Sequence, residues 1–239
     1  MSYEAVFLDL DDTLYPYPPC NEAGKRAAFA EAQRLGYDLS RAAFDELYQH
    51  GRRETKRELA GTASAHERFL YFKRAIRHHT GTSDAADALA LGEAYWGAYL
   101  EEMALFDGAV ETLEALRDAG LSVAIVSNLT TRIQLKKIRR LGLDPLVDEV
   151  LTSEETGREK PSAIMFTLPL AELDLRPSEA VMVGDSVRAD VEGGNAVGMD
   201  TVLLDHERED DDAGPSALSG HERPDHRVTE FAALTDVLL

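Results

Sequence analysis

An apolar run leads directly into three carboxylates near the start of the chain, in the sequence Val6-Phe7-Leu8-Asp9-Leu10-Asp11-Asp12-Thr13-Leu14. A short apolar run that contains Val and Phe and ends at polar residues predicts a buried strand. Asp9 and Asp11 are two residues apart, so an extended chain points both carboxylates to the same face. Buried carboxylates need a compensating charge, and a pair of them suits a divalent cation. For this segment alone, a strand followed by an acidic turn is the simpler alternative.

Short apolar strands alternate with helices in the second half of the chain, which predicts an α/β fold with a parallel sheet. Beyond the first strand, we expect strands at 122–127, 149–152, 180–183 and 201–204. We expect helices at 109–119, 131–141, 162–173, 188–197 and 229–239. The polar, acidic segment 205–226 is expected to be a solvated loop.

Residues 21–103 have a different pattern, rich in Ala, Arg and Glu and with apolar residues at helical spacing. Glycines at 36, 61 and 81 divide this segment into about four helices, enough for a small bundle. We expect the proline-rich residues 15–19 to leave the first strand as an extended chain. Ser83 is expected to cap the last helix, and Trp96 and Tyr99 to close the core of the bundle.

Composition excludes several classes of partner. The 239 residues include 44 Asp and Glu against 25 Lys and Arg, for a net charge of −19. Such a chain repels nucleic acids and anionic membranes. Because salt screens this self-repulsion, we hypothesise a cytoplasm rich in salt, as in halophiles. A single cysteine and the lack of a long apolar run fit a cytoplasmic protein.

Polar side chains follow several of the expected strands at the point where each strand ends. Asp9 and Asp11 follow the first strand, Ser127-Asn128 ends the second, and Asp185 follows the fourth. Ligands of open parallel sheets bind beyond the carboxyl ends of the strands, so we expect these groups to converge. Lys160, before Pro161 and a helix, can add a cation to the same edge. Each group alone is unremarkable, since a Ser-Asn pair is usually a turn and a single Lys is usually solvated.

This set of groups supports phosphoryl transfer through a covalent aspartyl-phosphate. Asp9 would attack phosphorus, and Asp11 would act as general acid and then as general base. Asp185 and Asp9 would bind Mg²⁺, which offsets the repulsion between nucleophile and substrate. Ser127, Asn128 and Lys160 would bind the phosphoryl oxygens.

Four short motifs resemble those of the haloacid dehalogenase-like hydrolases, in the same order. They are Asp9-Leu10-Asp11-Asp12-Thr13-Leu14, Ser127-Asn128, Lys160-Pro161 and Gly184-Asp185-Ser186-Val187-Arg188-Ala189-Asp190. The resemblance implies a Rossmann-like core of residues 1–16 and 104–239 and an inserted α-helical cap of residues 17–103. It implies that Asp11 also binds the metal through its backbone carbonyl, and that Asp190 is a further carboxylate of the metal site, directly or through water. Many relatives have Gly where this chain has Asp12, a variant that occurs in the family.

The function expected from this resemblance is that of a Mg²⁺-dependent phosphatase of a small phosphorylated metabolite. A sugar-phosphate mutase keeps both carboxylates and is the main alternative. A 2-haloacid dehalogenase is disfavoured because it lacks the carboxylate of Asp11 and needs no Mg²⁺, and a binding protein is disfavoured by the intact set of motifs. Arg52, Arg53 and Lys56 could meet a second anionic group of a substrate, although we expect them to be solvated. The sequence does not identify the phosphate ester or the oligomeric state.

Overall fold

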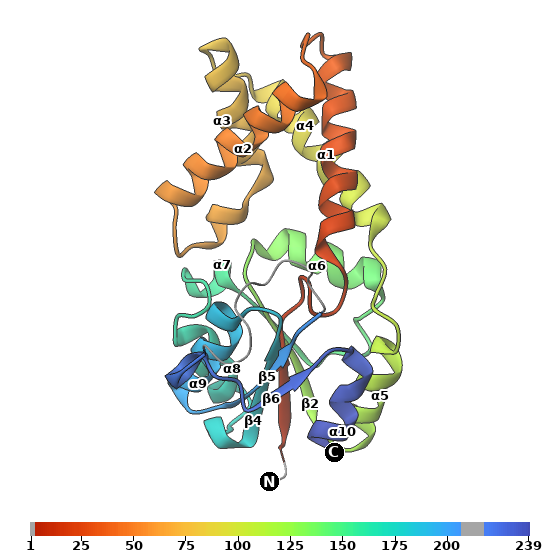
Figure 1. Cartoon of the computed structure of the whole chain (residues 1–239), viewed down its shortest axis with the longest axis vertical. Coiled ribbons are helices and arrows are strands. Elements are labelled where there is room, and N and C mark those ends of the chain that lie inside the picture. Colours follow the sequence, from red (N-terminus) through yellow and green to blue (C-terminus); the bar gives the residue numbers. More distant parts are fainter. Residues whose placement is uncertain (1–2, 207–217) are drawn as a thin grey trace.

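A six-stranded parallel sheet forms one half of the molecule (Figure 1). The structure, a computed structural model, describes residues 3–206 and 218–239. The strand order is β3-β2-β1-β4-β5-β6, and every neighbouring pair is parallel. The strands are β1 (Ala5–Leu8), β2 (Ser122–Ser127), β3 (Glu149–Thr152), β4 (Ala180–Gly184), β5 (Asp200–Leu204) and β6 (His226–Val228). The predicted α/β class is confirmed.

The first strand lies in the middle of the sheet because it is apolar on both faces. All four residues of β1 are buried, and the strand pairs with β2 on one side and β4 on the other. Val6 and Leu8 pack into one hydrophobic cluster, and Ala5 and Phe7 pack into a second. Alternate side chains of a strand point to opposite faces, so each face of the sheet carries its own core.

Helices cover both faces of the sheet. On one side, α5 (Ala109–Asp118) and α10 (Leu234–Leu238) contribute Leu113 and Leu234 to the cluster of Val6 (Figure 1). On the other, α8 (Ile164–Glu172) contributes Phe166 to the cluster of Phe7, next to α9 (Glu192–Val197). The remaining helices of this half are α6 (Thr131–Leu141), α7 (Ser153–Thr156), a π-helical turn (Val187–Val191) and 3₁₀ turns at Pro177–Glu179, Gly220–Glu222 and Phe231–Ala233.

The helical segment between β1 and α5 stands at the end of the molecule away from both termini (Figure 1). Its helices are α1 (Tyr17–Arg34), α2 (Arg41–Glu58), α3 (Arg68–Thr80) and α4 (Ala85–Glu102), with a 3₁₀ turn at Ala63–His66. We call residues 17–102 the cap; the assignment of separate core and cap domains stays a prediction. Among the described residues, no helix has the length and apolar character needed to cross a bilayer.

Two local expectations were wrong, and one short strand was not expected. The helix α1 begins at Tyr17, because prolines at 18 and 19 are tolerated in a first helical turn, where their missing N–H groups are not needed. Asp84, not Ser83, caps α4, and its Oδ1 accepts a hydrogen bond from Asp87 N at 2.9 Å. The edge strand β6 lies at the end of the expected loop 205–226, and its three mostly exposed residues carry no apolar run that predicts a strand. Residues 207–217 of that loop lie outside the described residues.

Candidate active site

The carboxyl ends of β1, β2 and β4 meet at the edge of the sheet that faces the cap. Asp9 follows β1 and donates its backbone N–H to Val183 O of β4 at 2.9 Å. Ser127 ends β2, and Asp185 follows β4. A cavity of about 390 Å³ opens between this edge and the cap, and these three residues line it together with Lys160. The convergence expected from the strand ends therefore occurs in the structure.

A buried lysine connects two of the carboxylates. Lys160 Nζ lies 2.8 Å from Asp9 Oδ1 and 2.7 Å from Asp190 Oδ1. Burial opposes the charge of Lys160, but Asp190 and Asp9 outweigh it and raise the lysine pKa. Burial raises the pKa of Asp9 to about 7; Lys160 acts against this rise, and Asp190 and Asp11 add to it. Asp9 is thus a carboxylate whose charge is costly in the absence of a further cation.

Asn128 holds the backbone of Lys160. Its Oδ1 accepts a hydrogen bond from Lys160 N at 2.8 Å, and its Nδ2 donates to Lys160 O at 3.5 Å. These contacts join the loop after β2 to the loop before α8, and they fix the point from which the lysine side chain enters the site. In this structure the Asn128 side chain therefore positions Lys160.

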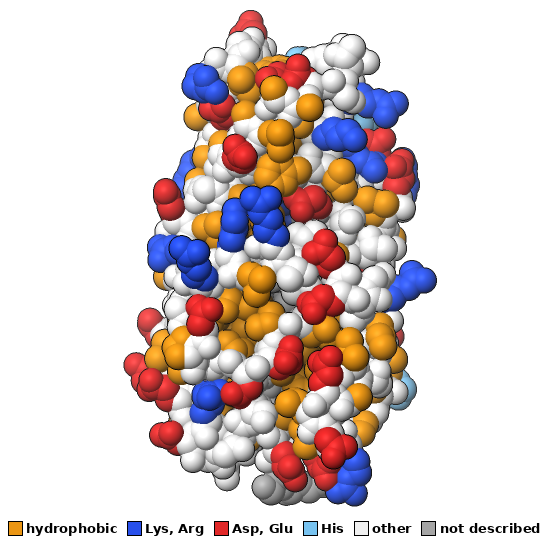
Figure 2. Space-filling model, turned by 180° about the vertical axis from the view of Figure 1, so that it is seen from behind, with side chains coloured by type: hydrophobic (Ala, Val, Ile, Leu, Met, Phe, Trp, Pro, Cys, Tyr) orange, Lys and Arg blue, Asp and Glu red, His pale blue; other side chains and the backbone are white. Residues whose placement is uncertain are grey.

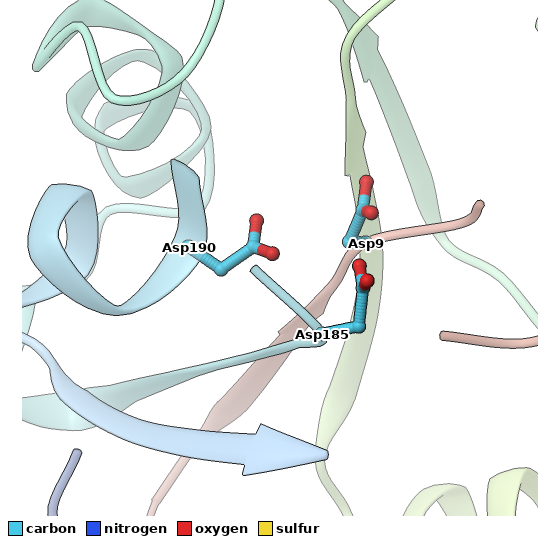
Figure 3. Close-up of side chains that lie close together, drawn as sticks. All are labelled: Asp9, Asp185 and Asp190. Carbon is cyan, nitrogen blue, oxygen red and sulfur yellow. The ribbon is translucent and has the colours of Figure 1, made fainter. Parts of the chain in front are cut away.

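Three carboxylates form a cluster that could hold a metal ion. Oxygen atoms of Asp9, Asp185 and Asp190 lie within 4.8 Å of one another (Figure 3). Such all-oxygen donors suit a hard divalent cation such as Mg²⁺. Asp190 Oδ2 also accepts a hydrogen bond from Ser186 N at 3.0 Å, so both oxygens of Asp190 have partners within the protein. A cation bound directly by Asp190 would therefore have to share this carboxylate with Lys160 and Ser186.

The side chain of Asp11 lies in a different environment from that of Asp9. Its Oδ1 lies 2.5 Å from Lys137 Nζ, and it accepts hydrogen bonds from the hydroxyls of Tyr15 and Tyr99. Gln134 Nε2 donates to Asp11 Oδ2 at 3.2 Å and to Ser127 Oγ at 2.5 Å. Burial alone would raise the pKa of Asp11, but Lys137 and the other donors lower it to about 2. The two aspartates of the first motif thus have pKa values shifted in opposite directions.

The backbone conformation at position 12 explains why an Asp can stand where many relatives have a Gly. Its φ of 61° lies in the left-handed region, which Gly, Asn and Asp adopt more readily than other residues. Asp12 Oδ1 accepts a hydrogen bond from Tyr17 N at 2.9 Å, at the first residue of α1. Asp in place of Gly therefore keeps the turn and adds a contact that starts the first cap helix.

A family model for haloacid dehalogenase-like hydrolases matches residues 3–198 of this chain, which includes all four motifs. The chain belongs to the haloacid dehalogenase-like hydrolases. It is 59% identical over 235 residues to the ribulose-1,5-bisphosphate 5-phosphatase of Halopiger xanaduensis, and the match covers 98% of each chain. It is 32% identical to the glyceraldehyde 3-phosphate phosphatase of Methanopyrus kandleri, over 84% of this chain and 83% of that one.

Solved structures of this hydrolase family share the fold. The HAD phosphatase of Thermococcus onnurineus superposes with a TM-score of 0.72 at 24% identity, covering 100% of this chain and 98% of that one. The HAD-hydrolase YfnB of Bacillus subtilis gives 0.71 at 22% identity, covering 100% and 99%. At these identities the likeness establishes the fold of the haloacid dehalogenase-like hydrolase and not its substrate.

Gln134 and Lys137, which contact Asp11 in this hydrolase, were not among the predicted site residues. Gln134 and Lys137 lie on the buried face of α6 with Ile133 and Ile138, although the many basic residues of this segment are typical of a surface helix. The signal was present, because positions 133, 134, 137 and 138 form one helical stripe and two of the four are polar. A polar residue in an apolar stripe needs a buried partner, and here that partner is Asp11.

Proposed function

We propose that the chain is a metal-dependent phosphatase that hydrolyses a small phosphorylated metabolite through a phosphoryl group carried on Asp9. The observation that carries this proposal is the meeting of Asp9, Lys160 and Asp185 at one cavity, each from a different loop at the carboxyl edge of the sheet. A nucleophile, a fixed cation and a metal-binding carboxylate at one point are the elements that phosphoryl transfer needs.

In the first step a carboxylate oxygen of Asp9 attacks phosphorus, and the bond from phosphorus to the ester oxygen breaks. Lys160, held by Asn128, neutralises charge on the phosphoryl oxygens, and Ser127 lies at the same cavity to bind them. Mg²⁺, which Asp9, the backbone carbonyl of Asp11, Asp185 and Asp190 would hold, would lower the repulsion between nucleophile and substrate. Removing one such electrostatic contact typically costs about 10²–10³ in rate.

In the second step water attacks phosphorus, which releases inorganic phosphate and regenerates the Asp9 carboxylate. Asp11 would protonate the leaving alkoxide in the first step and take the proton of the water in the second. A carboxyl with a pKa of about 2 is ionised at neutral pH and is ready to act as a base. To act as an acid, Asp11 has to give up its contact with Lys137 when the substrate binds.

For the substrate we propose a sugar bisphosphate, with ribulose 1,5-bisphosphate as the first compound to test. Support comes from the 59% identity to the Halopiger xanaduensis phosphatase over nearly the whole chain. The cavity volume of about 390 Å³ lies within the range usual for small-molecule sites.

Phosphate release tests the proposal. The purified protein, assayed with Mg²⁺ in high KCl, should release inorganic phosphate from ribulose 1,5-bisphosphate and, more slowly, from p-nitrophenyl phosphate. The Asp9→Asn variant and added EDTA should each abolish release, whereas Asp118→Asn, an exposed change at the end of α5, should not. Activity that survives Asp9→Asn would contradict the proposal. Transfer of the phosphoryl group to a second sugar hydroxyl in place of water would indicate a mutase.

A further inference from the structure

We infer that Arg52 and Lys56 of the cap form a binding subsite for a second phosphate group, one that does not react. This inference rests on the proposed phosphatase function, because it assigns the part of the substrate that stays intact. The ligand class that it identifies is a small bisphosphate, held at both ends of the cavity.

The first observation is the position of these two side chains. Arg52 and Lys56 are four residues apart on α2, so they share one face of the helix. Both are partly buried and line the same cavity as Asp9 and Lys160. Arg53, by contrast, is exposed and does not line this cavity. The expectation of a solvated surface is right for Arg53 and wrong for Arg52 and Lys56.

The second observation is that these cations have no carboxylate partner among the residues that the structure describes. All but three of the lysines and arginines within residues 3–206 and 218–239 either lie within 4.0 Å of an Asp or Glu oxygen or are exposed to solvent. The exceptions are Arg52, Lys56 and Arg68, and all three line the cavity. In a chain with 44 acidic and 25 basic residues, a partly buried group of unpaired cations is unexpected unless an anion binds there.

The groups next to these cations offset the positive charge only in part. Arg68 is buried, and its guanidinium lies over the rings of Tyr17 and Trp96. Its Nη2 donates a hydrogen bond to Tyr17 OH at 2.9 Å. Glu159 lies nearby, but its carboxylate accepts a hydrogen bond from Gly61 N at 3.1 Å and contacts His66 Nε2 at 2.7 Å. Burial, followed by the charges of Arg52 and Arg68, lowers the pKa of Lys56, and the charge of Glu159 acts against this shift without reversing it.

The charged residues on the two sides of the cavity, at the sheet edge and in the cap, indicate which class of ligand fits between them. The reacting phosphate belongs at Asp9 and Lys160, on the edge of the sheet, so Arg52 and Lys56 face a different part of the substrate. Phosphate groups suit a guanidinium, which can donate two parallel hydrogen bonds, together with a lysine. A monophosphate would leave these cations without a partner, whereas a bisphosphate would pair them and would fix which of its two phosphates reaches Asp9.

Kinetics with two substrates tests the inference. Wild type, Arg52→Gln, Lys56→Gln and the control Arg53→Gln are assayed with ribulose 1,5-bisphosphate and with p-nitrophenyl phosphate, which has no second phosphate. For each of the two cavity variants, we expect KM for the bisphosphate to rise roughly 10- to 100-fold, the loss typical of one charged hydrogen bond. The change in kcat, and the change in kcat/KM for p-nitrophenyl phosphate, should be several times smaller. Arg53→Gln should stay within about 2-fold of wild type for both substrates, because its side chain lies outside the cavity.

The kinetic results distinguish a failure of the proposed phosphate subsite from a failure of the proposed phosphatase function. Equal losses of kcat/KM for both substrates would overturn the inference, because Arg52 and Lys56 would then act on the reacting phosphate. A wild-type protein that hydrolyses p-nitrophenyl phosphate but no sugar bisphosphate would overturn the inference and leave the phosphatase function standing. A protein that hydrolyses neither ester would overturn the proposed function together with the inference that rests on it.

Discussion

Asp11 is the residue whose surroundings differ most from those expected. The sequence identifies it as a carboxylate two residues after Asp9, but its contacts come from Tyr15, Gln134 and Lys137, and the last two follow it by more than 120 residues. Side-chain partners at such separations depend on tertiary packing, which residue pattern and motif order do not contain. The same holds for the ion pair of Lys160 with Asp190.

The ion pair of Lys137 with Asp11 is open to a direct test of stability. In Lys137→Met the ion-pair partner of Asp11 is lost, and removing one partner of a buried pair typically costs about 3–5 kcal/mol. The Asp11 side chain is 26% exposed, so we expect a smaller loss, about 2–4 kcal/mol. Denaturant unfolding should record this loss for Lys137→Met and almost none for the neighbouring, exposed Lys136→Met. Equal effects of the two changes would contradict the assigned role of the ion pair.

Lys56 provides a pH-dependent prediction. Its folded-state pKa is lowered, so in the pH range below that pKa the charged side chain destabilises the fold. This penalty disappears as the pH rises from the folded-state pKa to the higher unfolded-state value. Lys56→Met should therefore unfold at a higher temperature than wild type at pH 7.5, and the difference should shrink toward pH 10. The exposed Lys73→Met serves as control, and a gain for Lys56→Met that is independent of pH would contradict the prediction.

Local sequence patterns predicted most of the helices and strands of the core. The expected bounds 122–127, 131–141 and 149–152 agree with β2, α6 and β3, because each segment has a clear apolar pattern and two of them end at a glycine or a polar pair. The strand β6 was missed because pairing with β5 forms it, not its own composition. How closely the cap helices approach one another also does not follow from the helical pattern.

Glycines allow that close approach within the cap. A Cβ added at Gly51 of α2 would clash with Tyr71 O of α3, whereas one at Gly97 of α4 would meet no atom within 4 Å. Gly51→Ala should therefore destabilise the protein by about 1–3 kcal/mol through overpacking. Gly97→Ala should stabilise it by about 0.5–1 kcal/mol, because alanine is the better helix former. Thermal unfolding of both variants tests this, and a stabilised Gly51→Ala would show that α2 and α3 do not pack as described.

The charge of the whole molecule is a separate property from the charge of its site. The net charge is −19, yet the cavity gathers Lys160 at its floor and Arg52, Lys56 and Arg68 in the cap. On the face in Figure 2, acidic side chains are scattered over the full length, while lysines and arginines gather mainly over the upper, helical half. An anion bound in this cavity would therefore meet these cations at short range, whereas salt screens the more distant acidic surface.

Salt should accordingly stabilise the fold. Raising KCl from about 0.1 M to about 1 M shortens the Debye length from about 10 Å to about 3 Å, which weakens repulsion among the acidic side chains. We expect the unfolding temperature to rise steadily over this range. The same concentrations of an uncharged osmolyte serve as control for excluded-volume effects, and a protein equally stable in low and high KCl would contradict the hypothesis of a salt-adapted surface.

Asp9 is the residue proposed to carry the phosphoryl group during turnover. The most direct measurement is a rapid acid quench of wild type and Asp9→Asn during turnover of a phosphate ester with Mg²⁺, followed by peptide mass spectrometry. We predict a phosphorylated wild-type peptide with the modification on Asp9, and no phosphorylation of the Asp9→Asn variant. Phosphorylation of another residue, or of the variant at the wild-type level, would contradict this role of Asp9.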